Sequence, residues 1–231
     1  MKRKLLMFSA LTLIVLGILA WQTYIHAVPQ VLIEQFSKLA AASAPIRPLS
    51  YVETRIDNLK LRAVLDNAHA QVGTTLSYDP AYRQLAYPGG DVPPDRGVCT
   101  DVVIRAYRAA NLDLQKVVHE DMRQAFPLYP KKWGLRQPDV NIDHRRVPNL
   151  QTYFDRHKQG LPVSPVAKDY LPGDLVTWKL TSKLDHIGIV SNRTTADGRP
   201  LIVHNIGAGA QLEDVLFGWA ITGHYRPAMA L

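Results

Sequence analysis

Apolar residues recur at helical spacing in the first half of the chain. Between Arg55 and Val72 they return every three or four positions, and Gly73 follows where the pattern stops. A second stretch, DRGVCTDVVIRAYRAA, carries an apolar face that begins after Cys99, while its arginines point elsewhere. NLQTYFDRHKQG indicates a shorter third helix that ends at a glycine. The pattern therefore predicts three helices between Arg55 and the last third of the chain.

The last third of the chain changes to short β-rich runs. LPGDLVTWKL, DHIGIVSN, PLIVHNIG and ITGHYR are separated by Gly, Pro, Asn and Asp. Before them, residues 113–150 are polar and irregular, and we expect a long surface excursion there. Helices followed by an antiparallel sheet predict an α+β domain, which we place at residues 51–231.

The N-terminus has the pattern of an exported protein. MKRK is followed by an uncharged, mostly apolar run over residues 5–21, and the basic flank in front predicts export of the remainder. We expect residues 1–27 to be a signal peptide cleaved after Ala27 or an N-terminal membrane anchor, with a buried core helix as the third interpretation. Residues 28–50 are expected to form a helix and a proline-containing linker. The working domain is then periplasmic or extracytoplasmic, and an uncleaved N-terminus would anchor it to the inner membrane.

Composition narrows the chemistry. The chain has 231 residues, 47% hydrophobic and 20% charged, which is an ordinary globular balance. Its single cysteine forms no internal disulfide, and zinc patterns of several cysteines are absent. A formal charge of +7 favours anionic partners such as nucleic acid, acidic lipid or cell-wall polymer without choosing among them. A lone cysteine in an exported protein is open to oxidation, which makes chemical use of Cys99 a stronger hypothesis.

Cys99 stands where a loop becomes a helix, and a helix N-terminus lowers the pKa of a thiol. Asp101 in the first turn would oppose thiolate formation, so a cationic partner is needed. His186 begins one predicted strand and His204 ends the next, and a hairpin would bring the two rings side by side. His204 would then orient His186, which is the third role in a catalytic triad.

Two other interpretations of these residues stay open. In the first interpretation, Cys99 is a packing residue, because a cysteine within a helix is often buried. The second is a zinc ion held by Cys99, His186 and His204, although these ligands lack tight local spacing and an obvious fourth member.

Taken together, the motifs resemble the NlpC-type papain-like cysteine peptidases. A cysteine that opens a helix, PGD before a strand, HIGIV on the next strand and a final VH occur in that order. YPGGDVP…GVCTDVVIRAYR…DLQ…VHEDM and VHNIG…ITGHYR resemble the bacterial family named domain of unknown function 1287, over most of residues 55–228. The resemblance implies a papain-like α+β fold, with helices packed on a small antiparallel sheet and the catalytic cysteine at a helix N-terminus.

The same resemblance implies roles for individual residues. Cys99 would be the nucleophile, His186 the base and His204 the orienting partner. Tyr87, in AYPGG, resembles the tyrosine that these enzymes place near the oxyanion site. No metal and no cofactor are implied. The long segment between the cysteine and the first histidine is expected to shape a substrate groove.

We therefore expect an exported cysteine hydrolase, a peptidase or amidase, that cleaves an amide bond in peptidoglycan peptides and does not act on nucleic acid. Two alternatives remain. A non-catalytic envelope binding module on the same fold would use the groove for binding alone. A thiol acyltransferase would pass the acyl group to an amine or hydroxyl instead of water.

Overall fold

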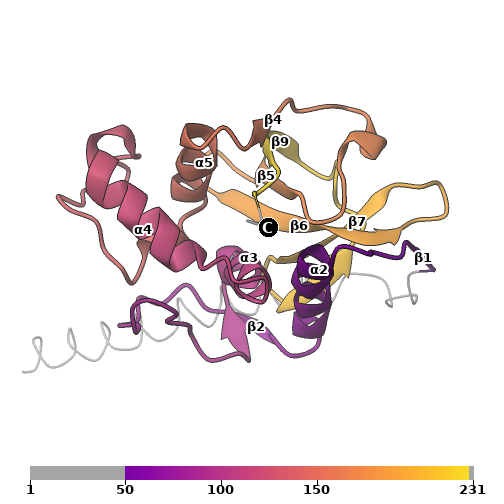
Figure 1. Cartoon of the computed structure of the whole chain (residues 1–231), viewed down its shortest axis with the longest axis horizontal. Coiled ribbons are helices and arrows are strands. Elements are labelled where there is room, and N and C mark those ends of the chain that lie inside the picture. The colour runs from indigo at the N-terminus through magenta and orange to yellow at the C-terminus, as the bar shows by residue number, and fades with distance from the viewer. Residues whose placement is uncertain (1–49, 229–231) are drawn as a thin grey trace, which may run out of the picture. The chain divides into compact units, whose positions relative to one another are not determined.

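The computed structural model describes residues 50–228, which Figure 1 draws in colour. The signal peptide or anchor expected over residues 1–27, and all but the last residue of the helix and linker expected over residues 28–50, lie outside the described residues. Within the described range, none of the helices has the length and apolar character that a membrane span requires.

The architecture combines helices with a seven-stranded antiparallel sheet, as the sequence predicts (Figure 1). Six strands follow the order β4-β9-β5-β6-β7-β8, and β1 pairs with the end of β6. The long strand β6 therefore contacts β5, β7 and β1. The strands of this sheet are β1 (Val52–Glu53), β4 (Gly160–Leu161), β5 (Leu175–Lys179), β6 (Asp185–Thr194), β7 (Pro200–Asn205), β8 (Ala210–Glu213) and β9 (Ala220–Tyr225).

The three predicted helices are present, although their bounds differ from the prediction, and the third begins two residues earlier than NLQTYFDRHKQG. They are α2 (Leu59–Gln71), α3 (Cys99–Arg108) and α5 (Val147–Arg156). The Asn58 side chain accepts a hydrogen bond from the backbone of Leu61 at 2.9 Å and so defines where α2 begins. Figure 1 shows α2 and α3 side by side below the sheet, and both pack against β6.

The prediction of a surface excursion over residues 113–150 is wrong for the first third of this stretch, which forms α4 (Leu114–Ala125). Asp113 caps this helix, because its side chain accepts from the backbone of Gln115 at 3.2 Å. Leu114, Val118 and Met122 are buried and follow one another at a spacing of four, which places them on one face. The charged residues between them hide this periodicity in the sequence. The rest of the stretch holds the short helices η1 (Phe126–Leu128) and η2 (Asp143–Arg145).

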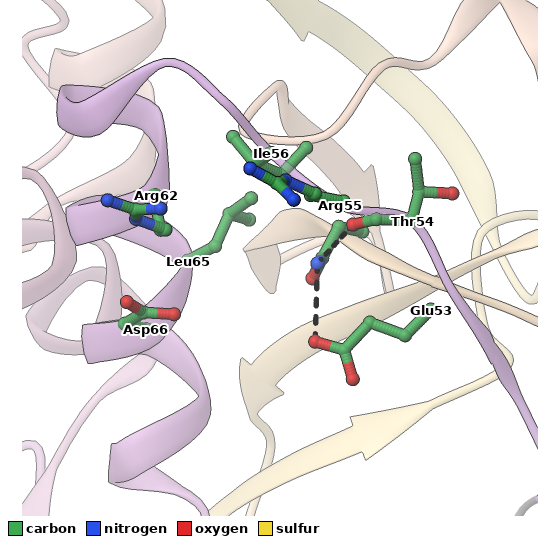
Figure 2. Close-up of a pocket in the computed structure, with 8 residues that line it drawn as sticks. Glu53, Thr54, Arg55, Ile56, Arg62, Leu65 and Asp66 are labelled. Carbon is green, nitrogen blue, oxygen red and sulfur yellow. Dashed lines mark hydrogen bonds between the residues drawn. The ribbon is translucent and has the colours of Figure 1, made fainter.

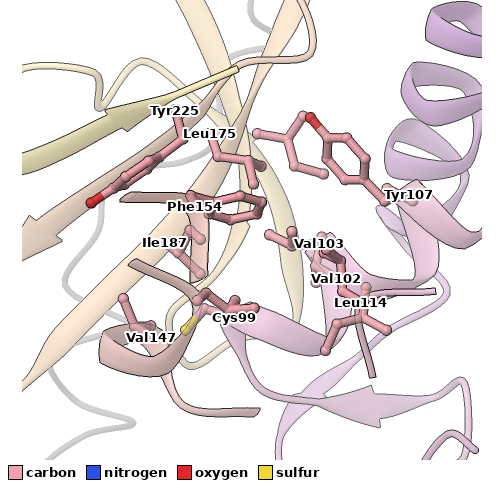
Figure 3. Packing of buried hydrophobic residues seen from close by; sticks show 14 of the residues in the cluster. Cys99, Val102, Val103, Tyr107, Leu114, Val147, Phe154, Leu175, Ile187 and Tyr225 are labelled. Carbon is pink, nitrogen blue, oxygen red and sulfur yellow. The ribbon is translucent and has the colours of Figure 1, made fainter. Parts of the chain in front are cut away.

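Hydrophobic cores cover both faces of the sheet. Ile187 and Ile189 pack in one cluster with α3, whereas Val190 packs in another. Successive residues of a strand point to opposite faces, so this division shows which side each position of β6 serves. Figure 3 shows the cluster on the α3 side. The opposite cluster consists of Tyr170, Val176, Trp178, Val190, Ile202 and Leu216.

The aspartate of the PGD motif does more than complete a turn. Asp174 accepts a hydrogen bond from the backbone of Leu171 at 2.8 Å, as a turn residue would. Its buried carboxylate also bonds His224 Nε2 at 2.7 Å and the guanidinium of Arg226 at 2.7 and 2.8 Å. These bonds attach the C-terminal end of β9 to the segment that enters β5.

Candidate functional site

Cys99 is the first residue of α3, as the sequence predicts. Its neighbours in Figure 3 include Val102, Val147 and Ile187, and the residue is only 3% exposed. The thiol lies close to the backbone N–H of Ile187, which acts as a hydrogen-bond donor to it. The sulfur is therefore at the sheet, beside the strand position that follows His186.

The environment of this thiol favours its neutral form. The pKa of Cys99 is raised to about 12, mainly by burial and with a smaller contribution from the charge of Asp101. The N–H groups of Ile187, Thr100 and Cys99 act in the opposite direction, as expected at a helix N-terminus, but do not balance the burial. The depressed pKa that the helix position suggests is therefore not found in this structure.

Asp101 faces inward and is neutralised by an arginine. Its Oδ2 accepts from the backbone N–H of Val98 at 2.7 Å and closes the first turn of α3. Arg145 of η2 donates to both carboxylate oxygens at 2.9 Å, and the two side chains are 4% and 1% exposed. The same guanidinium donates to the carbonyls of Ala81 and Asp79 at 3.0 and 3.1 Å.

The tyrosine beside Cys99 is Tyr78. It lies in β2 (Ser77–Tyr78), which pairs in parallel with β3 (Arg96–Gly97), so that Tyr78 is the partner of Gly97. Burial raises the pKa of the Tyr78 hydroxyl, and the neighbouring Cys99 adds to this. The hydroxyl therefore stays protonated and can donate.

Tyr87 occupies a different place. Its ring lies edge-on to His119 of α4, with the centroids 5.2 Å apart, and the side chain is 38% exposed. Burial raises the pKa of its hydroxyl, and the charge of Glu120, also on α4, adds to this. The structure does not bring Tyr87 into contact with Cys99. The prediction of Tyr87 rested on the resemblance of AYPGG to the tyrosine that NlpC-type peptidases place before the cysteine, whereas the β2–β3 pairing brings Tyr78 beside Cys99.

The two strand histidines lie side by side, as expected from the hairpin. Nε2 of His186 is 2.8 Å from Nδ1 of His204. Nε2 of His204 is in turn 2.8 Å from the carboxylate of Glu213 on β8. This bond lowers the pKa of Glu213, whereas burial lowers the pKa of His186 to about 3. Glu213 was not predicted, because its approach depends on the β7–β8 register, which pairs it with Ile202.

The thiol and the histidine pair meet at the first end of β6 but lie on opposite faces of it. His186 is the cross-strand partner of Trp178, and their rings are 5.8 Å apart on the face away from α3. Trp219 covers this pair of histidines, with its ring 6.0 Å from that of His186. In residues 50–228 no hydrogen bond joins Cys99 to either histidine, and Nδ1 of His186 has no partner.

The described part of the chain holds no group of three or more His, Cys, Asp or Glu side chains arranged to bind a metal ion. The site is therefore built of a buried thiol, a tyrosine hydroxyl and a histidine pair held by a carboxylate. Such groups can exchange protons and attack a carbonyl carbon.

Comparison with known proteins places the chain in a family. It is 61% identical over 164 residues to an uncharacterised protein of Escherichia coli strain K12, YijF, covering 71% of this chain and 80% of that protein.

Two solved structures are more distantly similar to this protein, each over 75% of this chain. One is a Staphylococcus aureus protein described as similar to lipoprotein, NLP/P60 family, at 13% identity, a TM-score of 0.37 and 43% coverage of that chain. The other is NlpC1 from Trichomonas vaginalis, at 17% identity, a TM-score of 0.37 and 46% coverage of that chain. The chain thus spans less than half of either structure, and a TM-score of this size does not establish a shared fold.

The family match is specific and long. Residues 65–227 match the family described as Domain of unknown function (DUF1287), and they contain Cys99, both strand histidines and Glu213. The chain therefore belongs to this family.

Proposed function

We propose that the protein is a cysteine hydrolase that cleaves an amide bond, with Cys99 as nucleophile and His186 as base. The observation that carries the proposal is the hydrogen-bonded chain from Glu213 through His204 to His186. This chain of hydrogen bonds ends at His186, and the backbone N–H of the next residue, Ile187, lies close to the thiol. Three buried or half-buried titratable groups in line, at the end of β6 where the thiol lies, are typical of a functional site.

The hydrogen-bonded chain selects the basic nitrogen of His186. A carboxylate only accepts hydrogen bonds, so Nε2 of His204 carries the proton that faces Glu213. With His204 neutral, its Nδ1 then accepts a hydrogen bond from the Nε2–H group of His186. The lone pair of His186 is therefore left on Nδ1, the ring nitrogen without a partner. Glu213 and His204 are thus positioning residues, and His186 Nδ1 is the base.

The resting site in this proposal has a neutral thiol and a neutral imidazole at the same end of β6, on opposite faces of the strand. Burial accounts for both, because it raises the pKa of Cys99 and lowers that of His186. For the reaction, the thiol and His186 Nδ1 must come within hydrogen-bond distance at the first end of β6, and the thiol proton then moves to this nitrogen as the sulfur attacks the carbonyl carbon. The leaving amine then takes this proton, and a thioester remains. Water, giving a proton to the same nitrogen, hydrolyses the thioester and restores the thiol.

Two groups are suited to stabilise the oxyanion in this mechanism. The backbone N–H of Cys99 lowers the pKa of its own thiol and belongs to the first turn of α3, where N–H groups have no partner within the helix. The Tyr78 hydroxyl is the second donor, and it takes the role that the sequence suggested for Tyr87.

We propose peptidoglycan peptides as the substrate and the periplasm, or another compartment outside the cytoplasm, as the place of action. The resemblance of the motifs to NlpC-type peptidases and the export pattern over residues 1–27 support both. The formal charge of +7 suits an anionic cell-wall polymer.

A non-catalytic binding module is the second candidate, because the thiol is buried and its pKa is raised. Acyl transfer to an amine or hydroxyl would use the same thioester, and water access would decide between the two reactions.

Replacement of the nucleophile tests the proposal. Cys99→Ala should abolish the release of fragments from purified peptidoglycan, measured by mass spectrometry of the products, because no thioester can form. The circular dichroism spectrum should be unchanged, since alanine fits the space of a small buried residue. Equal product formation by the variant and the unmodified chain would show that Cys99 is not the nucleophile.

A matched pair of tyrosine variants separates the two oxyanion assignments. Tyr78→Phe removes the hydroxyl beside Cys99 and should lower kcat by about a hundredfold, the usual loss when one oxyanion donor is removed. Tyr87→Phe removes a hydroxyl on the α4 side and should leave kcat unchanged. The reverse result would restore Tyr87 to the site and exclude Tyr78.

Glu213→Gln tests the hydrogen-bonded chain. An amide can donate as well as accept, so it no longer fixes the tautomer of His204 or the basic nitrogen of His186, and kcat should fall at least about tenfold. KM should change little, because the carboxylate touches no substrate in this mechanism. Asp214→Asn is the control, since Asp214 is the next residue but pairs with Arg199. Equal losses in the two variants would argue against a positioning role.

The pH dependence of thiol alkylation tests the resting state. A thiol whose pKa is raised gains its reactive thiolate only as the pH rises, so alkylation of Cys99 by iodoacetamide should be slow at neutral pH. Its midpoint should lie above the ordinary value of about 8.5, and unfolding in urea should return it there. A midpoint below pH 7 would instead indicate a resting thiolate–imidazolium pair.

A further inference from the structure

A pocket of about 330 Å³ lies between α2 and the segment that carries β1. Figure 2 shows Arg62 and Asp66 on one side of it and Glu53 and Thr54 on the other, with Leu65 pointing between them. The pocket lies near the last residues of β6, whereas His186 is near the first. Here the backbone N–H of Thr54 donates a hydrogen bond to the carbonyl of Asn192 at 2.9 Å. Its volume is at the lower end of the range for small-molecule sites.

A buried acceptor without a partner lines this pocket. Asn192 is only 7% exposed, and its Oδ1 receives no hydrogen bond within residues 50–228. The amide cannot easily turn, because its Nδ2 donates to the carbonyl of Thr54 at 2.8 Å and to Glu53 at 3.4 Å. A buried acceptor left in this state is costly, so the position favours a ligand that donates an N–H or O–H.

Opposite charges stand at the rim of the same pocket. Arg62 and Asp66 are one turn apart on α2, yet in the described range neither side chain forms an ion pair or a hydrogen bond. Other charges nearby are engaged, since Arg55 pairs with Asp57 at 2.9 Å and Glu53 with Arg193 at 3.2 Å. One guanidinium and one carboxylate are therefore available to a bound molecule.

We propose that this pocket binds a small zwitterion with an apolar body, the chemistry of a free amino acid or an unblocked dipeptide. The carboxylate of the ligand pairs with Arg62. The ammonium group donates to Asp66 and to Oδ1 of Asn192, which supplies the missing donor. Leu65 and Ile56, which line the pocket, contact the apolar side chain. No residue of this pocket belongs to the proposed hydrolytic site.

Calorimetric titration of the full chain with leucine tests the proposal. Leucine should bind, whereas N-acetylleucine, which lacks the ammonium, and leucinamide, which lacks the carboxylate, should each bind about tenfold more weakly. Leucyl-leucine is titrated in parallel. If it binds more tightly than leucine, the occupant is a dipeptide, and if leucine binds more tightly, the occupant is a free amino acid. Equal binding of the blocked and unblocked forms, or no binding of either zwitterion, would overturn the proposal.

Charge variants on α2 connect the binding to the pocket. Arg62→Gln should weaken leucine binding about tenfold and leave leucinamide binding unchanged, because only the carboxylate contact is lost. Asp66→Asn should reduce the preference for leucine over N-acetylleucine, because only the contact with Asn192 is left to the ammonium group. Lys116→Gln, at an exposed position of α4, is the control for loss of one positive charge and should bind leucine as the unmodified chain does. If all three variants bind alike, leucine is bound elsewhere and the proposal fails.

Discussion

The ion pair between Asp101 and Arg145 is the contact on which the rest of the site depends. Asp101 closes the first turn of α3 through Val98, and Arg145 joins that turn to the loop after β2 through the carbonyls of Asp79 and Ala81. Both side chains are almost fully buried, so loss of either partner would leave an uncompensated charge at a cost of about 3 kcal/mol or more. The pair therefore determines where Cys99 and the neighbouring tyrosine lie. The same carboxylate raises the pKa of the thiol, so the contact that positions the cysteine also opposes its ionisation.

The raised pKa of the thiol limits the chemistry that the site can perform. A resting ion pair would need a thiol that ionises readily and a histidine that accepts its proton, and burial disfavours both charged forms. A neutral pair can still react when proton transfer accompanies attack on the carbonyl, as in serine hydrolases. The carboxylate of Glu213 is then important, because it stabilises the histidine pair at the moment when positive charge forms. Trp219 lies edge-on to both rings, with its centroid 6.0 Å from that of His186 and 6.2 Å from that of His204.

Local sequence patterns predicted the helices and strands, whereas the pairing register between strands determines which side chains lie together in the site. The helix after Cys99 and the approach of His186 to His204 follow from periodicity and from a hairpin, which are short-range features. Tyr78 depends on a parallel pairing between segments that a long loop separates. Glu213 depends on the register of a third strand, and a shift of one residue would turn its side chain to the other face. The helix α4 was missed because charged residues separate its buried positions.

Strand β6 carries the two proposed sites at its two ends. His186 stands at its beginning, next to the position that contacts the thiol, and Asn192 stands near its end, where β1 is attached. The residues between them are fully buried and hydrogen-bonded to β5 and β7, which makes this part of the strand rigid. The two sites share the strand but no side chain. A variant that removes the rim charges of the pocket therefore leaves the hydrogen-bonded chain at the other end intact, and each proposal can fail without the other.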